Sequence, residues 1–184
     1  GGATFTIAAA DSFASRITGV EEIVAHGDTD QIITISLHNN AHEAGITVID
    51  LSADTDATSN NVVDVDEETT STKGFTITGS AGIDTVTGGA GPDTITGGAG
   101  ADILSGKEAA DIISGGAGID VISGGAGADV LTGGDDNDRF IGYTATADLV
   151  ASNTFVDEIT GSGGTGDAIE IDSSELAATF TIAS

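Results

Sequence analysis

The sequence predicts an all-β fold, a right-handed parallel β-solenoid, and three observations lead to this prediction. A nine-residue unit repeats seven times without insertion between residues 79 and 141. The 184 residues include 28 glycines and one proline, which indicates many tight turns. Before the repeats, strand-like runs follow one another at nearly regular intervals. A fixed period is typical of solenoids, in which each unit packs on its neighbours.

Each repeat divides into a turn and a strand. The copies, numbered 1 to 7, read GSAGIDTVT, GGAGPDTIT, GGAGADILS, GKEAADIIS, GGAGIDVIS, GGAGADVLT and GGDDNDRFI. Glycines in the first positions allow backbone angles with φ > 0 and favour a turn. The eighth position is always apolar, which predicts a short strand with one inward side chain. These inward residues are Val86, Ile95, Leu104, Ile113, Ile122, Leu131 and Phe140. Two copies then form one coil.

The sixth position of every copy is an aspartate. These residues are Asp84, Asp93, Asp102, Asp111, Asp120, Asp129 and Asp138. Parallel strands lie about 4.8 Å apart, so the aspartate of one coil faces the turn of the next. Carboxylates and carbonyls at that separation suit Ca²⁺, which takes 6 to 8 oxygens at roughly 2.3 to 2.6 Å. Mg²⁺ fits less well because it keeps its water and requires an octahedron.

The charge balance also indicates cations as partners. Asp and Glu number 30 against 4 Lys and Arg, a formal net charge of -26. This field repels nucleic acid and anionic lipid, and it destabilises the compact state unless cations neutralise it. A hydrophobic content of 39% argues against disorder. Without cysteine the chain has neither disulfides nor thiolate metal sites. No apolar run is long enough to insert into a membrane.

The seven copies resemble the RTX nonapeptide G-G-x-G-x-D-x-U-x, and the resemblance covers about a third of the chain. It implies a parallel β-roll with several Ca²⁺ ions bound between turns. It also implies export in an unfolded state by a type I system and folding outside the cell.

Carried onto this sequence, the resemblance assigns the calcium ligands. On one edge Asp84 pairs with Asp102, Asp102 with Asp120, and Asp120 with Asp138; on the other, Asp93 pairs with Asp111 and Asp111 with Asp129. The carbonyls that complete the sites belong to Gly79, Ala81, Gly88, Ala90, Gly97, Ala99, Gly115, Ala117, Gly124, Ala126 and Gly133. The alternative is a solenoid whose aspartates only cap turns.

Copy 4, GKEAADIIS, departs from the pattern. Ala109 stands where the repeat requires a glycine with φ > 0, which costs a non-glycine residue on the order of 1 kcal/mol. Lys107 adds a positive charge beside the expected cation sites and could substitute for an ion. We therefore expect the Asp93, Asp111 and Asp129 edge to bind Ca²⁺ weakly or lose it, and the other edge to keep three ions. The alternative is neutral drift in a redundant array.

The flanking segments, 1–78 and 142–184, are also expected to be β-rich. Strand-like runs begin near Ile17, Ile32, Ile46, Val62 and Phe75. The nearly even steps between these starts predict looser coils of the same solenoid, with a separate β-sandwich as the alternative. The C-terminal segment is predicted to close the array. Its acidic residues, Asp157, Asp167 and Asp172, either hold another ion or form a solvated face.

No catalytic motif is present, and the chain is not predicted to be an enzyme. His38 and His42 lie four residues apart, but the intervening asparagines are poor helix formers and H-E-x-x-H does not occur. The sequence also lacks G-x-S-x-G and GK[ST]. The segment from Asp54 begins like an EF-hand loop but has Ser59 and Val65 where that loop needs Gly and Glu.

The resemblance therefore favours a calcium-dependent structural module of a bacterial cell-surface or secreted protein, of the surface-layer or adhesin type. Such a module would fold on binding Ca²⁺ outside the cell and self-associate into a lattice or fibre. The alternative is the C-terminal RTX secretion domain of a type I-secreted toxin or hydrolase. An ice-binding solenoid would need ranks of outward threonines, but Thr85, Thr87, Thr94 and Thr96 give only a short patch.

Overall fold

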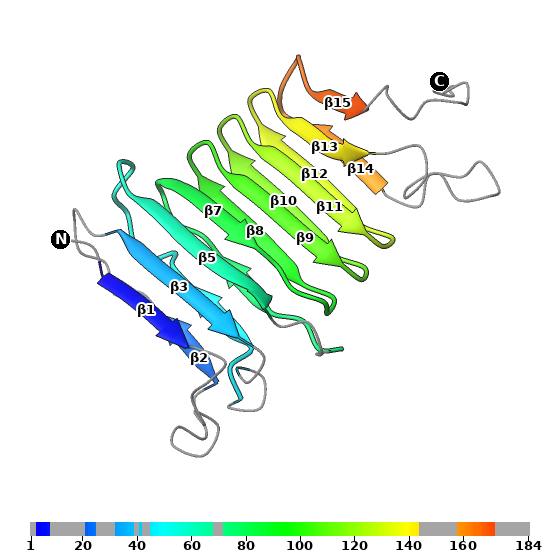
Figure 1. Cartoon of the computed structure of the whole chain (residues 1–184). Coiled ribbons are helices and arrows are strands. Elements are labelled where there is room, and N and C mark those ends of the chain that lie inside the picture. Colours follow the sequence, from blue (N-terminus) through cyan, green and yellow to red (C-terminus); the bar gives the residue numbers. More distant parts are fainter. Residues whose placement is uncertain are drawn as a thin grey trace.

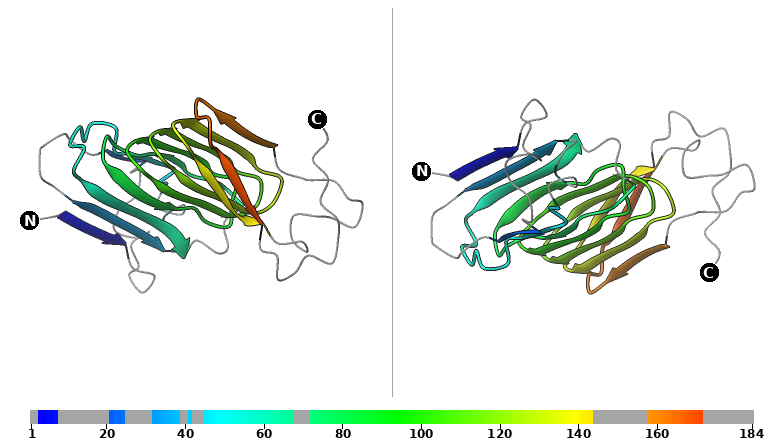
Figure 2. Two further views of the ribbon diagram at one scale, coloured as in Figure 1. Left: turned by 90° about the horizontal axis from the view of Figure 1, so that it is seen from above. Right: turned by 90° about the horizontal axis from the view of Figure 1, so that it is seen from below.

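The computed structural model describes residues 3–7, 21–24, 32–38, 41, 45–67, 72–143 and 158–171. In these residues the chain winds into two parallel sheets that face each other across one core (Figures 1 and 2). Successive strands alternate between the sheets, so each pair of strands forms one coil. The predicted parallel β-solenoid is confirmed.

The two sheets have eight and seven strands, and every pairing is between neighbouring coils. The first sheet contains, in spatial order, β1 (Ala3–Ile7), β3 (Ile33–His38), β5 (Asn60–Glu67), β7 (Ile83–Thr87), β9 (Ile103–Glu108), β11 (Val121–Ala126), β13 (Arg139–Tyr143) and β15 (Ala168–Ile171). The second contains β14 (Glu158–Ser162), β12 (Val130–Asp135), β10 (Ile112–Ala117), β8 (Thr94–Ala99), β6 (Thr76–Thr78), β4 (Val48–Asp50) and β2 (Glu22–Val24).

Within the repeats each coil consists of two copies, as the nine-residue period predicts. Ile95 pairs with Ile113 in the second sheet, and Leu104 pairs with Ile122 in the first. Because side chains alternate across a strand, this register keeps every eighth-position residue on the inner face. In β10, for example, Ile113 is 1% exposed and its neighbour Ile112 is 54% exposed.

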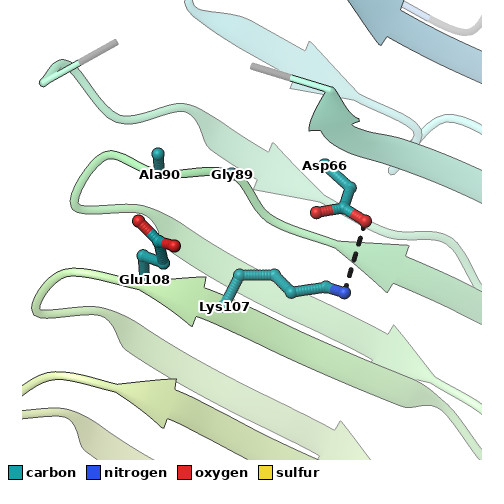
Figure 3. Close-up of a pocket in the computed structure, with 5 residues that line it drawn as sticks. All are labelled: Asp66, Gly89, Ala90, Lys107 and Glu108. Carbon is teal, nitrogen blue, oxygen red and sulfur yellow. Dashed lines mark hydrogen bonds and ion pairs between the residues drawn. The ribbon is translucent and has the colours of Figure 1, made fainter. Parts of the chain in front are cut away.

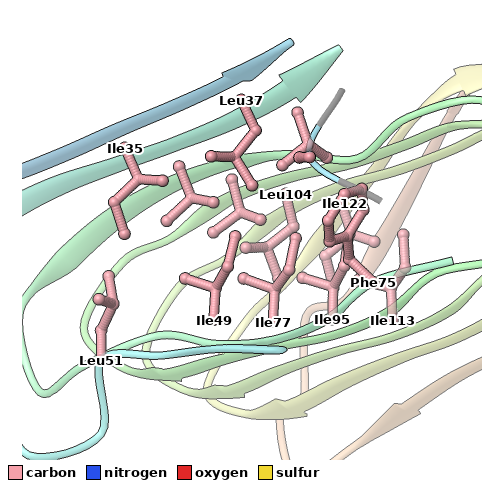
Figure 4. Packing of buried hydrophobic residues seen from close by; sticks show 14 of the residues in the cluster. Ile35, Leu37, Ile49, Leu51, Phe75, Ile77, Ile95, Leu104, Ile113 and Ile122 are labelled. Carbon is pink, nitrogen blue, oxygen red and sulfur yellow. The ribbon is translucent and has the colours of Figure 1, made fainter. Parts of the chain in front are cut away.

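The core consists of two stacked rows of aliphatic and aromatic side chains, one from each sheet (Figure 4). All seven eighth-position residues are buried in it, as predicted. The same rows continue into the N-terminal coils through Ile35, Val63, Ile49 and Ile77. Burying one such side chain stabilises the fold by about 1.5–3 kcal/mol, and every coil contributes two.

The N-terminal coils belong to the same solenoid and are longer than the repeats. Ala3 pairs with Ile33, and Ile35 pairs with Val63. The coil becomes shorter between Val63 and Val86, where β5 meets the repeats. Both sheets run without interruption from these coils into the repeats, which excludes a separate β-sandwich. The expected strand near Ile17 lies outside the described residues.

A further coil follows the repeats. Strand β14 adds to β12 with Leu131 opposite Ile159, and β15 adds to β13 with Phe140 opposite Ile169. Both pairings span more of the sequence than the pairings between repeats, so this coil is longer. The predicted closing segment thus continues both sheets.

Replacing an inward residue of a central coil tests the packing. We expect Ile113→Ala to lower the free energy of unfolding by about 2–5 kcal/mol, because the neighbouring coils cannot close the cavity. Ile112→Ala, one residue away on the outer face, is the matched control and should change it by less than about 1 kcal/mol. Urea unfolding of both variants in excess Ca²⁺ gives the comparison. Equal losses in the two variants would contradict this assignment of the core.

Candidate metal centre

The repeated aspartates stand in two columns, one on each edge of the solenoid. The first edge, where the chain passes from the second sheet to the first, carries Asp84, Asp102, Asp120 and Asp138. The second edge carries Asp93, Asp111 and Asp129. All seven side chains are at least 98% buried. The structure thus brings the aspartates together as the sequence predicted, one above another at successive coils.

In every repeat aspartate after Asp84, one carboxylate oxygen fixes the register between coils. Oδ1 of Asp102 accepts a hydrogen bond from the backbone N–H of Asp84, 18 residues earlier, at 2.8 Å. The same bond recurs along both columns at 2.7–2.9 Å, with Asp111, Asp120, Asp129 and Asp138 as acceptors. Hydrogen bonds to a charged acceptor are among the stronger ones in proteins. Each of these aspartates therefore holds its own coil against the preceding one.

The second oxygen is left without a hydrogen-bond partner in four aspartates. These are Oδ2 of Asp102, Asp111, Asp120 and Asp138. Buried polar atoms are almost always partnered, because burying them unpartnered costs about 1–3 kcal/mol each and more for a charged group. Four such atoms in one repeated position are oxygens that a bound cation would coordinate.

Three of these oxygens, on Asp102, Asp111 and Asp120, share a small space with a carbonyl of the next coil. A β-carbon placed on Gly97 would lie 2.5 Å from the carbonyl oxygen of Gly115 and still closer to Oδ2 of Asp102. A β-carbon on Gly88 would lie 2.5 Å from both Oδ2 of Asp93 and the carbonyl oxygen of Gly106. Two oxygens that both face a point at roughly the Ca²⁺–O distance form a cradle for a hard cation. The first glycine of the repeat is needed because any side chain there would fill the cradle.

Of the predicted carbonyl ligands, the structure places those of Gly97, Gly115, Gly124 and Gly133 at such cradles. It adds the carbonyl of Gly106, which the sequence analysis omitted although copy 4 keeps its first glycine. The carbonyl of Ala117 instead accepts a hydrogen bond from the N–H of Gly100 at 2.8 Å. First-position carbonyls are thus better placed for a cation than this third-position one.

The turns of the repeats fall into two conformations. In copies 3 to 7 the second and fourth residues have positive φ, and we call these turns open. The residues concerned are Gly98, Gly100, Lys107, Ala109, Gly116, Gly118, Gly125, Gly127, Gly134 and Asp136. Copies 1 and 2 have no positive φ at these positions, and we call their turns closed.

In the closed turns the aspartate binds its own backbone. The N–H of Ser80 donates to Oδ2 of Asp84 at 2.6 Å, and the Ser80 hydroxyl contacts the same carboxylate. The N–H of Gly89 donates to Oδ2 of Asp93 at 2.8 Å. Ser80 carries a β-carbon that disfavours positive φ, and Gly91 precedes Pro92, which favours an extended conformation. Pro92 therefore favours the closed turn of copy 2, whereas the β-carbon of Ser80 does not by itself explain copy 1, because Lys107 takes positive φ at the same position.

The irregular copy 4 keeps the open conformation. Lys107 and Ala109 have φ of 81° and 75°, so both take the left-handed backbone of the glycines that they replace. The prediction that Ala109 adopts positive φ is confirmed. Asp111 keeps its hydrogen bond to the N–H of Asp93, and a β-carbon on Gly106 would lie 2.6 Å from the carbonyl oxygen of Gly124. Weak calcium binding on this edge stays a prediction.

The side chain of Lys107 does not reach the aspartate column. Its Nζ forms an ion pair with Oδ2 of Asp66 at 3.3 Å, beside a shallow pocket also lined by Gly89, Ala90 and Glu108 (Figure 3). The expectation that Lys107 substitutes for a cation among the buried carboxylates is therefore wrong. Its charge instead connects copy 4 to the end of β5 across the intervening coil.

Burial disfavours the ionised form of the carboxylates when no cation is bound. It raises the pKa of Asp102 and of Asp111 to about 7, and that of Asp120 to about 6. Negative charges one coil away add to the rise, Asp84 and Asp120 for Asp102, and Asp93 and Asp129 for Asp111. Burial likewise raises the pKa values of Asp84, Asp93 and Asp138. A divalent cation between coils would remove this repulsion.

A hydrogen-bonded network of side chains closes the N-terminal end of the first column. Nδ2 of Asn61 donates to Oδ2 of Asp54 at 2.9 Å and to Oγ of Ser80 at 3.1 Å. Oδ1 of Asn61 accepts from the N–H of Ile33 at 2.8 Å, as the repeat aspartates accept from the preceding coil. Asp54, which begins the EF-hand-like segment, is thus part of this network.

Acidic or histidine side chains alone do not form a metal site in the described part of the chain, where no three of them converge. Backbone carbonyls must complete any site. His26 and His42, and the acidic Asp157 and Asp172, lie outside the described residues. Where the structure describes the chain, no helix has the length and apolar character of a membrane span.

Comparison with known proteins identifies the repeat segment. The family model of the RTX calcium-binding nonapeptide repeat (4 copies) matches residues 78–113 and again residues 105–140, together about a third of the chain. No curated protein and no solved structure gives a significant match. The match covers the two aspartate columns and ends before β14.

The stability of the metal-free chain should fall as the pH rises from about 4 to about 7. Buried aspartates with raised pKa bind more protons in the folded than in the unfolded state, so protonation stabilises the fold below the unfolded value of 3.8. That contribution is lost as the pH passes through the folded values of about 7. Thermal melts in EDTA between pH 4.5 and pH 8 test this. A melting temperature that rises with pH would contradict it.

Relieving the backbone strain in copy 4 should stabilise the fold. We expect Ala109→Gly to raise the free energy of unfolding by about 0.5 kcal/mol, because the relief of strain at a φ of 75° exceeds the cost of glycine's greater flexibility in the unfolded chain. Ala110→Gly, the neighbouring control without positive φ, should lower it by about 0.5–1 kcal/mol through the greater flexibility of the unfolded chain. Urea titrations of both variants measure the two changes in the free energy of unfolding, which should have opposite signs. A loss of stability in Ala109→Gly would argue against strain at this position.

Proposed function

From the premise that residues 78–140 are RTX calcium-binding nonapeptide repeats, we propose that this chain is a calcium-dependent structural module of a bacterial cell-surface or secreted protein. Repeats of this family bind Ca²⁺ and are typical of secreted proteins. We assign the finer role to surface-layer or adhesin proteins, and the location to the outside of the cell. The observation that carries the proposal is the set of buried, unpartnered Oδ2 atoms of Asp102, Asp111, Asp120 and Asp138.

The proposed mechanism couples folding to ion binding. Without a cation, the stacked carboxylates repel one another and leave buried oxygens unpartnered, both of which destabilise the compact state. A cation bound by Oδ2 of one turn and a first-position carbonyl of the next coil would turn the repulsion into a bridge. An ion at a ten- to hundredfold excess over its Kd stabilises the folded state by about 1.4 to 2.7 kcal/mol per site. The free energy of unfolding of a typical domain is about 5–15 kcal/mol, so one ion contributes only part of it. Several ions together would contribute an amount of similar size.

The sites proposed from the sequence are not equivalent. Within each edge, we propose that the open turns supply the stronger sites: Asp102, Asp120 and Asp138 on the first edge, and Asp111 and Asp129 on the second. Asp84 and Asp93 already accept hydrogen bonds from their own turns, so an ion there must compete with Ser80 and Gly89. A crystal structure of the calcium-loaded chain would count the ions on each edge and would also decide whether the second edge binds weakly.

We further propose that the module associates with copies of itself. Large apolar side chains point outward from both sheets, among them Ile103, Ile112 and Val130. At the two ends of the sheets, β1, β2, β14 and β15 each pair on one side only among the described strands. Exposed strand edges and apolar faces both favour association. Calcium would control this assembly by ordering the coils that present them.

Calcium dependence can be tested with a nearly isosteric variant. In EDTA, we expect Asp120→Asn to be more stable than the wild type, because the amide keeps Oδ1 as an acceptor and removes one buried charge. In excess Ca²⁺ the order should reverse, since the variant loses about 1.4 kcal/mol or more of ion binding. Thermal melts and circular dichroism in both conditions measure the two differences.

Glu108→Gln is the matched control, because it removes one charge from an exposed side chain of the same array. It should leave the calcium-induced stabilisation unchanged. If Ca²⁺ changes neither the melting temperature nor the circular dichroism spectrum of the wild type, the proposed function is wrong.

A further inference from the structure

The coil after the repeats contains a turn, outside the nonapeptide pattern, that shares the positive φ of the second position with the open turns but not that of the fourth. Residues 161–167 connect β14 to β15 on the first edge, directly beyond the turn of copy 7. Ser162 lies opposite Gly134 in the sheet and has a φ of 77°, the left-handed backbone of the second position in every open turn. The N–H of Gly163 donates to the carbonyl oxygen of Gly134 at 2.6 Å.

Asp167 continues the first aspartate column. Its Oδ1 accepts a hydrogen bond from the backbone N–H of Asp138 at 3.0 Å, as Asp138 does from Asp120 at 2.9 Å. The separation is 29 residues instead of 18. Asp167 also stands six residues after Gly161, whereas Asp138 stands five after Gly133. This extra residue and the longer coil explain why a nine-residue pattern does not include the turn.

The carboxylates of Asp138 and Asp167, on successive coils of the first edge, differ in their surroundings. Asp138 is 0% exposed and its Oδ2 has no hydrogen-bond partner, while Asp167 is exposed to solvent. A β-carbon on Gly133 would lie 2.1 Å from Oδ2 of Asp138, much as one on Gly115 would lie 2.0 Å from Oδ2 of Asp120. Besides burial, the charges of Asp167, Asp136 and Asp135 raise the pKa of Asp138. Negative potential therefore concentrates at this end of the column.

We propose that Asp138 and Asp167 form a further divalent-cation site between copy 7 and the turn 161–167, with Ca²⁺ as its ion. This inference rests on the proposed function, because it extends the same column of sites by one coil. Backbone oxygens must complete the shell, since no third acidic side chain converges there among the described residues. Solvent reaches Asp167, so water supplies part of the coordination and the ion exchanges faster than in the buried sites. The site joins the closing coil to the repeats.

Counting bound calcium tests the proposal on the full 184-residue chain. Equilibrium dialysis against ⁴⁵Ca²⁺ should show one ion fewer per chain for Asp167→Asn than for the wild type. The amide still offers Oδ1 to the N–H of Asp138, so the register between coils is kept. Glu158→Gln is the matched control, because it removes one charge from an exposed side chain of the same coil and should bind as many ions as the wild type.

The outcomes separate this inference from the proposed function. An unchanged ion count in Asp167→Asn, with the other sites filled, overturns the inference alone, whereas a wild type that binds no calcium overturns the proposed function. A calcium-loaded crystal structure of the wild type gives a result that does not depend on how the variant folds. An ion at about 2.3–2.6 Å from Oδ2 of Asp138 and from Asp167 would support the site. Ions in the open turns of the repeats without one here would refute it.

Discussion

The stacking of the coils depends on one interaction, the hydrogen bond from a backbone N–H to the aspartate Oδ1 of the next coil. It recurs at 2.7–2.9 Å along both edges and holds the repeats at a step of 18 residues. To make it, the fold buries a carboxylate in every turn, and at Asp102, Asp111 and Asp120 it leaves the second oxygen unpartnered and facing a carbonyl. The interaction that fixes the register thus also creates the need for a cation.

Two opposing contributions follow from this arrangement. The rows of Leu, Ile, Val and Phe between the sheets favour the stacked coils with or without cations. The carboxylate columns oppose stacking unless their charge is neutralised. The balance differs along the chain, because the closed turns of copies 1 and 2 satisfy their aspartates internally. In the proposed mechanism, the coils next to the N-terminal region would therefore depend less on calcium than those of copies 3 to 7.

Copy 4 shows how much departure the array tolerates. Its Lys107 and Ala109 take a left-handed backbone at some energetic cost, and yet Asp111 keeps the position of its counterparts. The neighbouring coils impose this conformation, since both of them pair with β9 and fix its register. Lys107 gains an ion pair with Asp66, which is exposed and therefore worth less than about 1 kcal/mol. Stacking, more than local preference, decides the turn.

The sequence by itself determined the solenoid, the inward row and the columns of aspartates, because a strict period repeats the same local geometry at each coil. It also indicated the left-handed backbone of Ala109. Only the tertiary structure decided which carboxylate oxygens remain unpartnered, where Lys107 binds, and that Asp167 continues the first column. These features depend on contacts between residues 18 to 41 positions apart, and in the closing coil the insertion removes the period that would have predicted them. Periodicity specifies what every coil shares, whereas contacts between coils decide where they differ.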